Sequence, residues 1–190
     1  VTIGLDIAKS VFHLVFMNQS GRVLRKKKLR RHQMLSYFSQ LEPCIVVMEA
    51  CGSCHYWCRE LTKAGHEVKA IAPQYVVAYR KGNKHDYNDA EAIAEASQRE
   101  GMRFVPFKSQ DQQDIQLMHR IRERMIAQQT ALSNQIRGLL SEYGIVYARG
   151  VATLVKELPL TLEEADNGLS MLARRQFQGL LNDLRELREH

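Results

Sequence analysis

The sequence predicts an α/β fold, in which a mixed β-sheet with flanking helices is followed by a long helical hairpin or coiled coil. The first half of the chain alternates short β-branched or aromatic runs with helical segments, whereas helical periodicity dominates the second half. Apolar residues make up 45% of the chain and charged residues 25%. These are values of a folded globular chain, so wholesale disorder is excluded.

Three strands are expected to open the sheet as an antiparallel meander. Residues 2–8 and 11–17 are rich in β-branched and aromatic side chains, and a turn leads from the second run into the basic segment 22–29. A short helix is expected over 33–41, because its apolar residues fall on one face. The Val-rich run 44–48 is too short for a helix, which indicates a buried strand.

The segment 52–65 predicts a helix that a glycine ends, and a further strand is expected over 66–71. Pro73 begins a helix that we expect to reach Lys81, and the Ala/Glu-rich segment 86–99 predicts another. This order of elements is expected of an RNase H-like (RuvC-like) domain, in which the fourth strand lies beside the first. We assign residues 1–104 to it.

Residues 105–190 predict a helical extension. A heptad-like apolar stripe runs from Ile115 to Tyr143, and a second amphipathic helix is expected over 161–190. We expect these helices to form either an antiparallel hairpin or a dimer seam, and a seam between copies would make the protein a homo-oligomer, a dimer or larger. The alternative is that both helices pack on the sheet.

The charge distribution suggests a polyanionic partner. The formal net charge is +6 and the isoelectric point is near 9.2. The excess of basic over acidic residues is largest in the first quarter of the chain, which favours nucleic acid as the partner. No apolar run reaches the ~18–20 residues that a membrane helix needs. We therefore expect a cytoplasmic protein that does not enter a membrane.

The cysteines suggest two kinds of site that we do not favour. Cys51, Cys54 and His55 match the c-type haem attachment string, and Cys58 would complete a zinc set. Haem attachment requires an exported chain, and zinc sites usually join two separated pairs of ligands. Reduced, partly buried thiols are the expected state.

Four carboxylates occupy positions that suggest a shared site. Asp6 lies near the end of the first predicted strand, and Glu49 ends the fourth. If these strands are neighbours, both acids project from the same edge of the sheet. Asp86 and Asp89 begin a predicted helix and lie on one face of it, where simple N-capping is the alternative role.

Four converging acids repel one another strongly unless a cation binds between them. Oxygen-only ligation fits Mg²⁺ or Mn²⁺ rather than zinc. Two such ions can stabilise the entering and leaving oxygens of a phosphodiester, which is nuclease or recombinase chemistry.

Strings throughout the chain resemble the insertion-sequence one-ten (IS-one-ten) family of transposases, the DEDD class with a RuvC-like domain. The resemblance covers roughly the whole chain, and together the strings are highly specific. They are GLDIAKSVF at 4–12, MEACGSCHYW at 48–57, GHEVKAIAPQYV at 65–76, KGNKHDYNDAEAIAEA at 81–96, VPFKSQDQQDIQLMHRIR at 105–122 and LSNQIRGLLSEYGI at 132–145.

The resemblance implies a DNA transposase guided by a structured, bridge-type non-coding RNA. It also implies that Asp6, Glu49, Asp86 and Asp89 form the catalytic, metal-binding tetrad. In this family a separate C-terminal domain supplies a nucleophilic serine, and no part of residues 1–190 resembles that domain. The chain is therefore expected to bind nucleic acid and metal without exchanging strands alone.

Basic residues in three groups are candidates for contacts with nucleic-acid phosphates. Those on the predicted edge strand could instead discourage aggregation, and those on the long helix could be a solvated face. The candidates are Arg22, Arg25, Lys26, Lys27, Lys28, Arg30 and Arg31 on or beside the edge strand, Arg80, Lys81 and Lys84 before the acid pair, and Arg120 and Arg124 on the long helix.

Three other functions compete with this interpretation. A stand-alone RuvC-type Holliday-junction resolvase or RNase H-like nuclease would use the same acids for hydrolysis. An actin-like kinase or ATPase is suggested by GLDIAKS but needs a second Gly-rich phosphate hairpin, and only Gly144 and Gly150 remain downstream in a helical context. A non-catalytic RNA-binding or dimerisation module is the third.

Overall fold

The structure is a computed structural model that describes residues 1–80 and 86–189. The chain forms two compact units, Val1–Gln112 and Gln113–His190. No helix in the part of the chain that the structure describes is long and apolar enough to cross a membrane.

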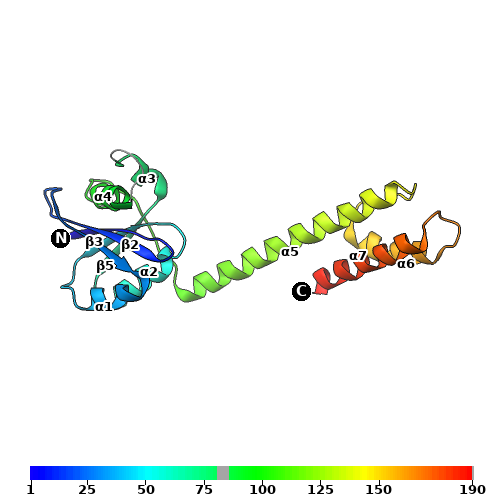
Figure 1. Cartoon of the computed structure of the whole chain (residues 1–190), viewed down its shortest axis with the longest axis horizontal. Coiled ribbons are helices and arrows are strands. Elements are labelled where there is room, and N and C mark those ends of the chain that lie inside the picture. The colour runs from blue at the N-terminus through cyan, green and yellow to red at the C-terminus, as the bar shows by residue number, and fades with distance from the viewer. Residues whose placement is uncertain (81–85, 190) are drawn as a thin grey trace. The chain divides into compact units, whose positions relative to one another are not determined.

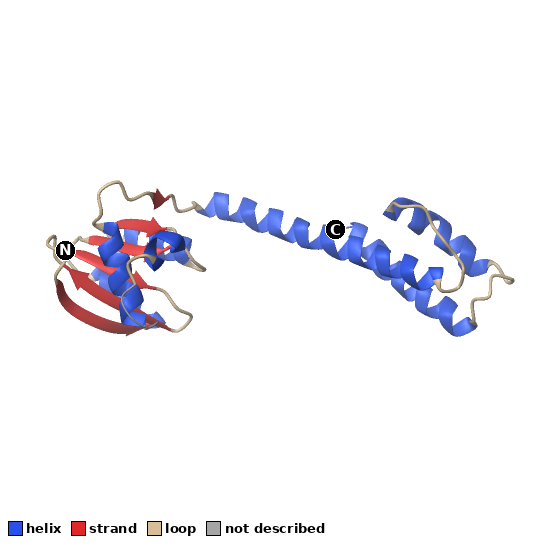
Figure 2. Ribbon diagram, turned by 90° about the horizontal axis from the view of Figure 1, so that it is seen from above, coloured by secondary structure: helices blue, strands red, loops and turns tan. Residues whose placement is uncertain are grey.

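The N-terminal unit contains a six-stranded sheet in the order β3-β2-β1-β4-β5-β6, with the strands red in Figure 2. The first three strands are antiparallel, β4 is parallel to β1, and β5 is parallel to β4. The predicted mixed sheet, with its fourth strand beside its first, is confirmed. The strands are β1 (Thr2–Asp6), β2 (Val11–Met17), β3 (Val23–Arg30), β4 (Ile45–Glu49), β5 (Glu67–Ile71) and β6 (Phe104–Val105).

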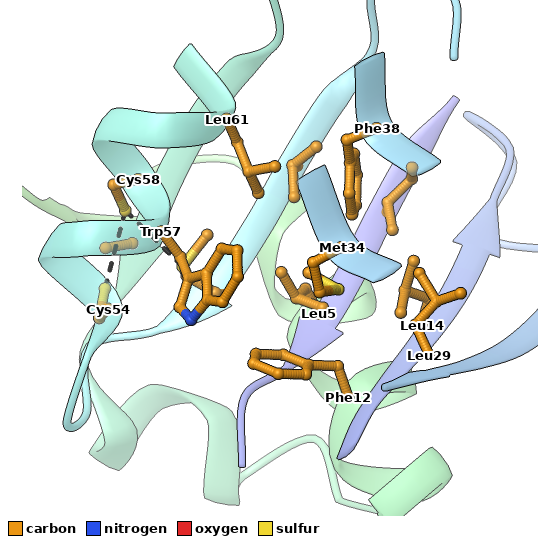
Figure 3. Packing of buried hydrophobic residues seen from close by; sticks show 14 of the residues in the cluster. Leu5, Phe12, Leu14, Leu29, Met34, Phe38, Cys54, Trp57, Cys58 and Leu61 are labelled. Atoms are coloured by element: carbon orange, nitrogen blue, oxygen red, sulfur yellow. Dashed lines mark hydrogen bonds between the residues drawn. The ribbon is translucent and has the colours of Figure 1, made fainter. Parts of the chain in front are cut away.

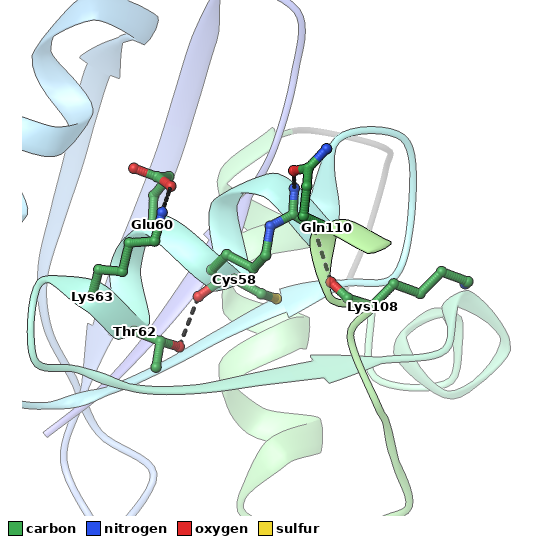
Figure 4. Close-up of polar contacts among 7 residues, drawn as sticks. Cys58, Glu60, Thr62, Lys63, Lys108 and Gln110 are labelled. Atoms are coloured by element: carbon green, nitrogen blue, oxygen red, sulfur yellow. Dashed lines mark hydrogen bonds and ion pairs between the residues drawn. The ribbon is translucent and has the colours of Figure 1, made fainter. Parts of the chain in front are cut away.

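The last strand and the residues after it extend this unit beyond position 104, where the sequence suggested a boundary. β6 pairs antiparallel with β5 but is only two residues long, too short to give a sequence signal. The Arg59 guanidinium also donates hydrogen bonds to the Lys108 carbonyl (2.9 Å) and the Gln110 side chain (3.3 Å), so the segment after β6 stays attached (Figure 4).

One face of the sheet is covered by two helices, α1 (Met34–Ser39), which follows a 3₁₀ turn η1 (Arg31–Gln33), and α2 (Cys54–Lys63). Large apolar side chains fill the space beneath them, as Figure 3 shows. All four cysteines are free thiols, as expected, and Cys54 and Cys58 are fully buried in this core. The face is therefore a conventional hydrophobic core. Its most buried members include Leu5, Phe12, Leu14, Met34, Phe38, Met48 and Leu61.

The opposite face carries α3 (Pro73–Val77) and α4 (Asp86–Ser97), as Figure 1 shows. Here α4 lies very close to β1 at Gly4. A Cβ atom added to Gly4 would be 2.0 Å from the Ala90 carbonyl oxygen and 2.8 Å from the Ala94 Cβ. Real Cβ atoms do not approach so closely, so only glycine allows this contact.

The second unit is helical and is built from most of α5 (Gln110–Ser141) with α6 (Val151–Glu163) and α7 (Met171–Glu189). The expected single helix over 161–190 is wrong, because residues 164–170 separate two helices and Gly168 has a φ of +73°. These helices bury one shared apolar cluster. It contains Ile136 and Leu140 from α5, Leu154 and Leu158 from α6, and Ala173, Phe177, Leu181 and Leu184 from α7.

Only part of the predicted apolar stripe on α5 packs against other helices of the unit. Leu132 and Ile136 pack in the helical cluster, whereas Ile115 and Met118 are 55% and 70% exposed. Packing within the unit therefore involves the C-terminal part of α5, and the coiled coil itself stays a prediction.

Candidate functional site

Asp6 and Glu49 end two adjacent parallel strands. The register pairs Leu5 of β1 with Met48 of β4, so the acids that follow lie at the same carboxyl edge. On the other side of β1, Asp6 is opposite His13 of β2, which is in turn opposite Lys28 of β3. Residues that are directly opposite in neighbouring strands share a face of the sheet. One row of polar side chains therefore crosses four strands.

This row faces α4. Gly4, two residues before Asp6, contacts α4, and residues two apart on a strand share a face. The first turn of α4 carries Asp86. Ligand atoms of Asp6, His13 and Asp86 all lie within 4.8 Å of one another, and His13 Nδ1 is 3.4 Å from Asp86 Oδ2. Two strands and one helix thus bring three potential ligands together.

Glu49 and Asp89 are not members of this three-residue cluster, but their negative charges, like that of Asp86, act on Asp6. The pKa of Asp6 is raised from the ordinary 3.8 to about 6, first by burial and then by the negative charges of Asp89, Asp86 and Glu49, with Arg80 opposing them. The field of the three other acids is therefore felt at the half-buried carboxyl group of Asp6.

Asp89 is the most buried of the acids in α4, with a side chain only 10% exposed, and it forms an ion pair with Arg80. The sequence predicts Arg80 as a phosphate contact, but its guanidinium is already paired with Asp89. Lys81 and Lys84, predicted beside it, lie outside the described residues.

The donor set fits a hard divalent cation. Carboxylate oxygens are preferred by Mg²⁺ and Mn²⁺. Burial first, and then repulsion from the other acids, raises the pKa of Asp6, and a bound cation would relieve both effects. The imidazole nitrogen of His13 is acceptable to Mn²⁺ more readily than to Mg²⁺. Among the described residues, the only cluster of three or more candidate ligands is Asp6, His13 and Asp86, and it includes no cysteine. Cys51 nevertheless lies near the site, because burial and then the negative charges of Glu49 and Asp6 raise the pKa of its thiol.

His13 was not predicted as a site residue. Its signal in the sequence is a single polar side chain within the apolar run VFHLVFM, on the alternate positions to Phe12 and Leu14. The alternation places His13 on the other face from these core residues. The alternation alone does not show that Asp6 and Asp86 lie next to His13 in the folded protein.

The basic residues of β3 are divided between the two faces. β3 is an edge strand, as predicted. Lys26, Lys28 and Arg30 are opposite Val15, His13 and Val11, so they share the face of the acids. Lys26 Nζ is 3.0 Å from a Glu91 carboxylate oxygen of α4.

Arg25 and Lys27 lie on the opposite face. The Arg25 guanidinium is 4.1 Å from the centre of the Phe16 ring and donates a 2.8 Å hydrogen bond to the Tyr37 hydroxyl. Lys27 Nζ is 4.3 Å from the Tyr37 ring centre. These two cations therefore stack on aromatic rings away from the acids.

The other predicted basic residues lie outside the strand. Arg22 precedes β3 and Arg31 follows it, and both are exposed. Arg120 and Arg124 are exposed on α5, within the second unit.

Comparison with known proteins identifies relatives for most of the chain. The DEDD transposase family of the IS110 type, described as "Transposase", matches residues 3–145. A probable family 20 transposase of Pseudomonas aeruginosa is 52% identical over 147 residues, which cover 77% of this chain and 44% of that protein. The transposase for insertion sequence element IS1111A of Coxiella burnetii is 43% identical over 96% of this chain and 50% of its own length.

A putative transposase of Sinorhizobium fredii is also 43% identical, over 98% of this chain and 48% of that protein. The chain thus spans about half the length of the curated relatives it matches. Among solved structures, RuvC of Thermus thermophilus aligns with a TM-score of 0.41 and 14% identity, covering 55% of this chain and 99% of that one.

Proposed function

The chain belongs to the DEDD transposase family of the IS110 type, and from this premise we propose that it is the metal-binding and nucleic-acid-binding part of a DNA recombinase. In this proposal Asp6, Glu49, Asp86 and Asp89 hold one or two Mg²⁺ or Mn²⁺ ions at the scissile phosphate. The observation that supports it is the cluster of Asp6, His13 and Asp86, whose ligand atoms lie within 4.8 Å of one another. The pKa of Asp6, raised to about 6 by burial and then by the charges of the three other acids, agrees with it.

A divalent cation bound at these oxygens would neutralise the carboxylates and polarise the phosphodiester. The chain's own residues prepare the place for it. His13 is opposite Asp6 in the sheet and its Nδ1 lies 3.4 Å from the exposed carboxylate of Asp86, and Arg80 forms an ion pair with Asp89. Gly4 allows α4 to come close enough for this arrangement.

We further propose DNA as the substrate, a bridge-type RNA as the guide and a homo-oligomer as the working form, because the family resemblance implies them. Lys26, Lys28 and Arg30 are the basic residues of β3 that share the face of the acids, so they are the proposed phosphate contacts nearest to the site. Strand exchange by a serine nucleophile also belongs to this proposal, and none of residues 1–190 is assigned that role.

Metal binding is the first test. We expect Mn²⁺ to raise the melting temperature of the purified protein, because a ligand that binds only the folded state stabilises it, by about 2.7 kcal/mol at a hundred times the dissociation constant. Asp6→Asn and Glu49→Gln should remove this shift. Asp166→Asn, at an exposed acid of the second unit, is the control that should keep it. An unchanged Mn²⁺ shift in both tetrad variants would contradict the metal assignment.

Recombination by the full-length enzyme is the second test. Asp6→Asn and Glu49→Gln should abolish it while circular dichroism shows a folded protein. Retained recombination would refute the role of these acids. Metal-dependent hydrolysis of DNA by the wild type without strand exchange would instead favour the nuclease or resolvase alternative.

A further inference from the structure

An open cleft of about 610 Å³ lies where the β1–β2 turn meets the segment that leaves β3. Three of its lining residues are lysine or arginine, and none is acidic. The lining consists of Lys9, Ser10, Val11, Arg30, Arg31 and His32. Such a lining favours an anion.

The walls of the cleft are tied together by hydrogen bonds. The Arg31 amide donates to the Ser10 carbonyl at 2.9 Å, and the Arg31 guanidinium reaches the Lys9 carbonyl at 3.4 Å. The same guanidinium lies 5.3 Å from the centre of the Trp57 ring, which holds its orientation. Within the described ranges, no ion pair neutralises Lys9, Arg30 or Arg31. The cleft is therefore positively charged and already formed.

The cleft lies beside the acid site. Lys9 is three residues beyond Asp6, in the turn that follows β1. Arg30 shares the acid face with Lys28 and Lys26. Alternate residues of a strand are roughly 6.7 Å apart, so these three cations form a regular row from the middle of β3 to the cleft. A nucleic-acid strand that follows this row has phosphates at a similar spacing.

We propose that this cleft binds a backbone phosphate of the nucleic-acid strand that is held at the acids. The inference rests on the proposed function and assigns a role to Lys9 and Ser10, which the metal chemistry leaves without one. Lys9 and Arg30 supply the charge nearest to the acids, and the Ser10 hydroxyl is a hydrogen-bond donor in the same lining. Arg31, whose guanidinium stacks on Trp57, forms the opposite wall. The ligand is a phosphodiester, which DNA and RNA share.

The test measures the affinity of fluorescently labelled single-stranded DNA and RNA by anisotropy at several salt concentrations. Lys9→Ala and the double variant Lys9→Ala/Arg30→Ala are compared with Lys63→Ala/Arg99→Ala. The control pair removes the same charge from α2 and from the segment after α4, where Lys63 pairs with Glu60 and Arg99 pairs with Glu95. Mn²⁺ binding is measured on every variant to verify that the acid site is intact.

We expect the cleft double variant to bind at least about tenfold more weakly near 0.1 M salt and Lys9→Ala to be intermediate. The slope of log affinity against log salt should fall by about 1.4 for two lost phosphate contacts. The control pair should bind within about twofold of the wild type, and Mn²⁺ binding should be unchanged throughout. A loss for DNA alone, for RNA alone or for both supports the site and identifies the strand.

Two results would overturn the inference in distinguishable ways. If the wild type binds Mn²⁺ and nucleic acid, and the cleft double variant binds nucleic acid like the control pair, the cleft assignment alone fails. If the wild type binds neither, the proposed function fails and the cleft assignment fails with it.

Discussion

The two faces of the N-terminal sheet are covered in different ways. Beneath α1 and α2, large side chains such as Phe12, Leu14 and Phe38 fill the space by bulk. Beneath α4 the contact with β1 depends instead on Gly4 and on small residues of the helix. Close approach there brings the acidic first turn of α4 to the strand ends. The larger hydrophobic cluster and the candidate site therefore lie on opposite faces of one sheet, and the face of the site also buries a smaller apolar cluster that includes Val47, Ile71 and Ile93.

A single strand contributes to both faces. In β2, Phe12 and Leu14 are fully buried in the apolar core, while His13 between them contacts Asp86. β3 follows the same rule, with Arg25 and Lys27 over aromatic rings on one side and Lys28 beside His13 on the other. Strand alternation thus separates structural residues from candidate functional residues at neighbouring positions.

The largest expected effect is at the close contact between α4 and β1. Gly4→Ala should lower the free energy of unfolding by more than about 3 kcal/mol, because the new Cβ meets backbone that cannot give way. Gly138→Ala in α5 is the matched control, since nothing lies within 4 Å of a Cβ there. It should be neutral or stabilising by about 0.5–1 kcal/mol. Urea unfolding measures both, and equal effects would show that close packing of α4 is not required.

The second effect separates the cations of the two faces. Lys28→Ala/Arg30→Ala should weaken binding of single-stranded DNA about tenfold, because both cations share the face of the acids, whereas Lys26 on that face is paired with Glu91. Arg25→Ala/Lys27→Ala removes the same charge from the other face and should weaken binding less. Anisotropy titrations of the two pairs at one salt concentration decide between them. Equal losses would indicate that basic residues on both faces of β3 contact nucleic-acid phosphates.

The smallest effect concerns the charge of Asp6. Its pKa is about 6 in the folded state against 3.8 ordinarily, so the folded protein binds this proton more tightly than the unfolded chain. Without metal, Asp6 therefore makes stability fall as pH rises from about 4 to about 6, and the penalty persists above that range. Asp6→Asn should remove it.

We expect the metal-free Asp6→Asn variant to be more stable than the wild type at pH 7 by on the order of 1 kcal/mol, after allowing for partial exposure of the carboxylate. At pH 3 the two proteins should be equally stable, because Asp6 is then neutral in both states. Thermal or urea unfolding across this pH range measures the difference. A variant that is less stable at pH 7 would contradict the crowding of the four acids.

The sequence by itself determined the local elements and the positions of the acids within them. β-branched runs predicted the first five strands to within a few residues, and Asp6, Glu49 and the Asp86–Asp89 pair were assigned correctly to strand ends and a helix start. The short strand β6 and the break at 164–170 were missed. The strand β6 has only two residues, which are too few to show an alternating pattern. The break was missed because it separates two helices that each pack against α5, and this depends on tertiary contacts.

Only the tertiary structure decided which residues meet. The parallel register of β1 and β4 sets Asp6 beside Glu49, and the antiparallel register of β2 adds His13. The same pairing decides which cations of β3 lie on the face of the acids and which face Phe16 and Tyr37. Periodicity along a chain shows that a strand has two sides. Hydrogen bonding between distant segments decides what each side contacts, and no local pattern contains that information.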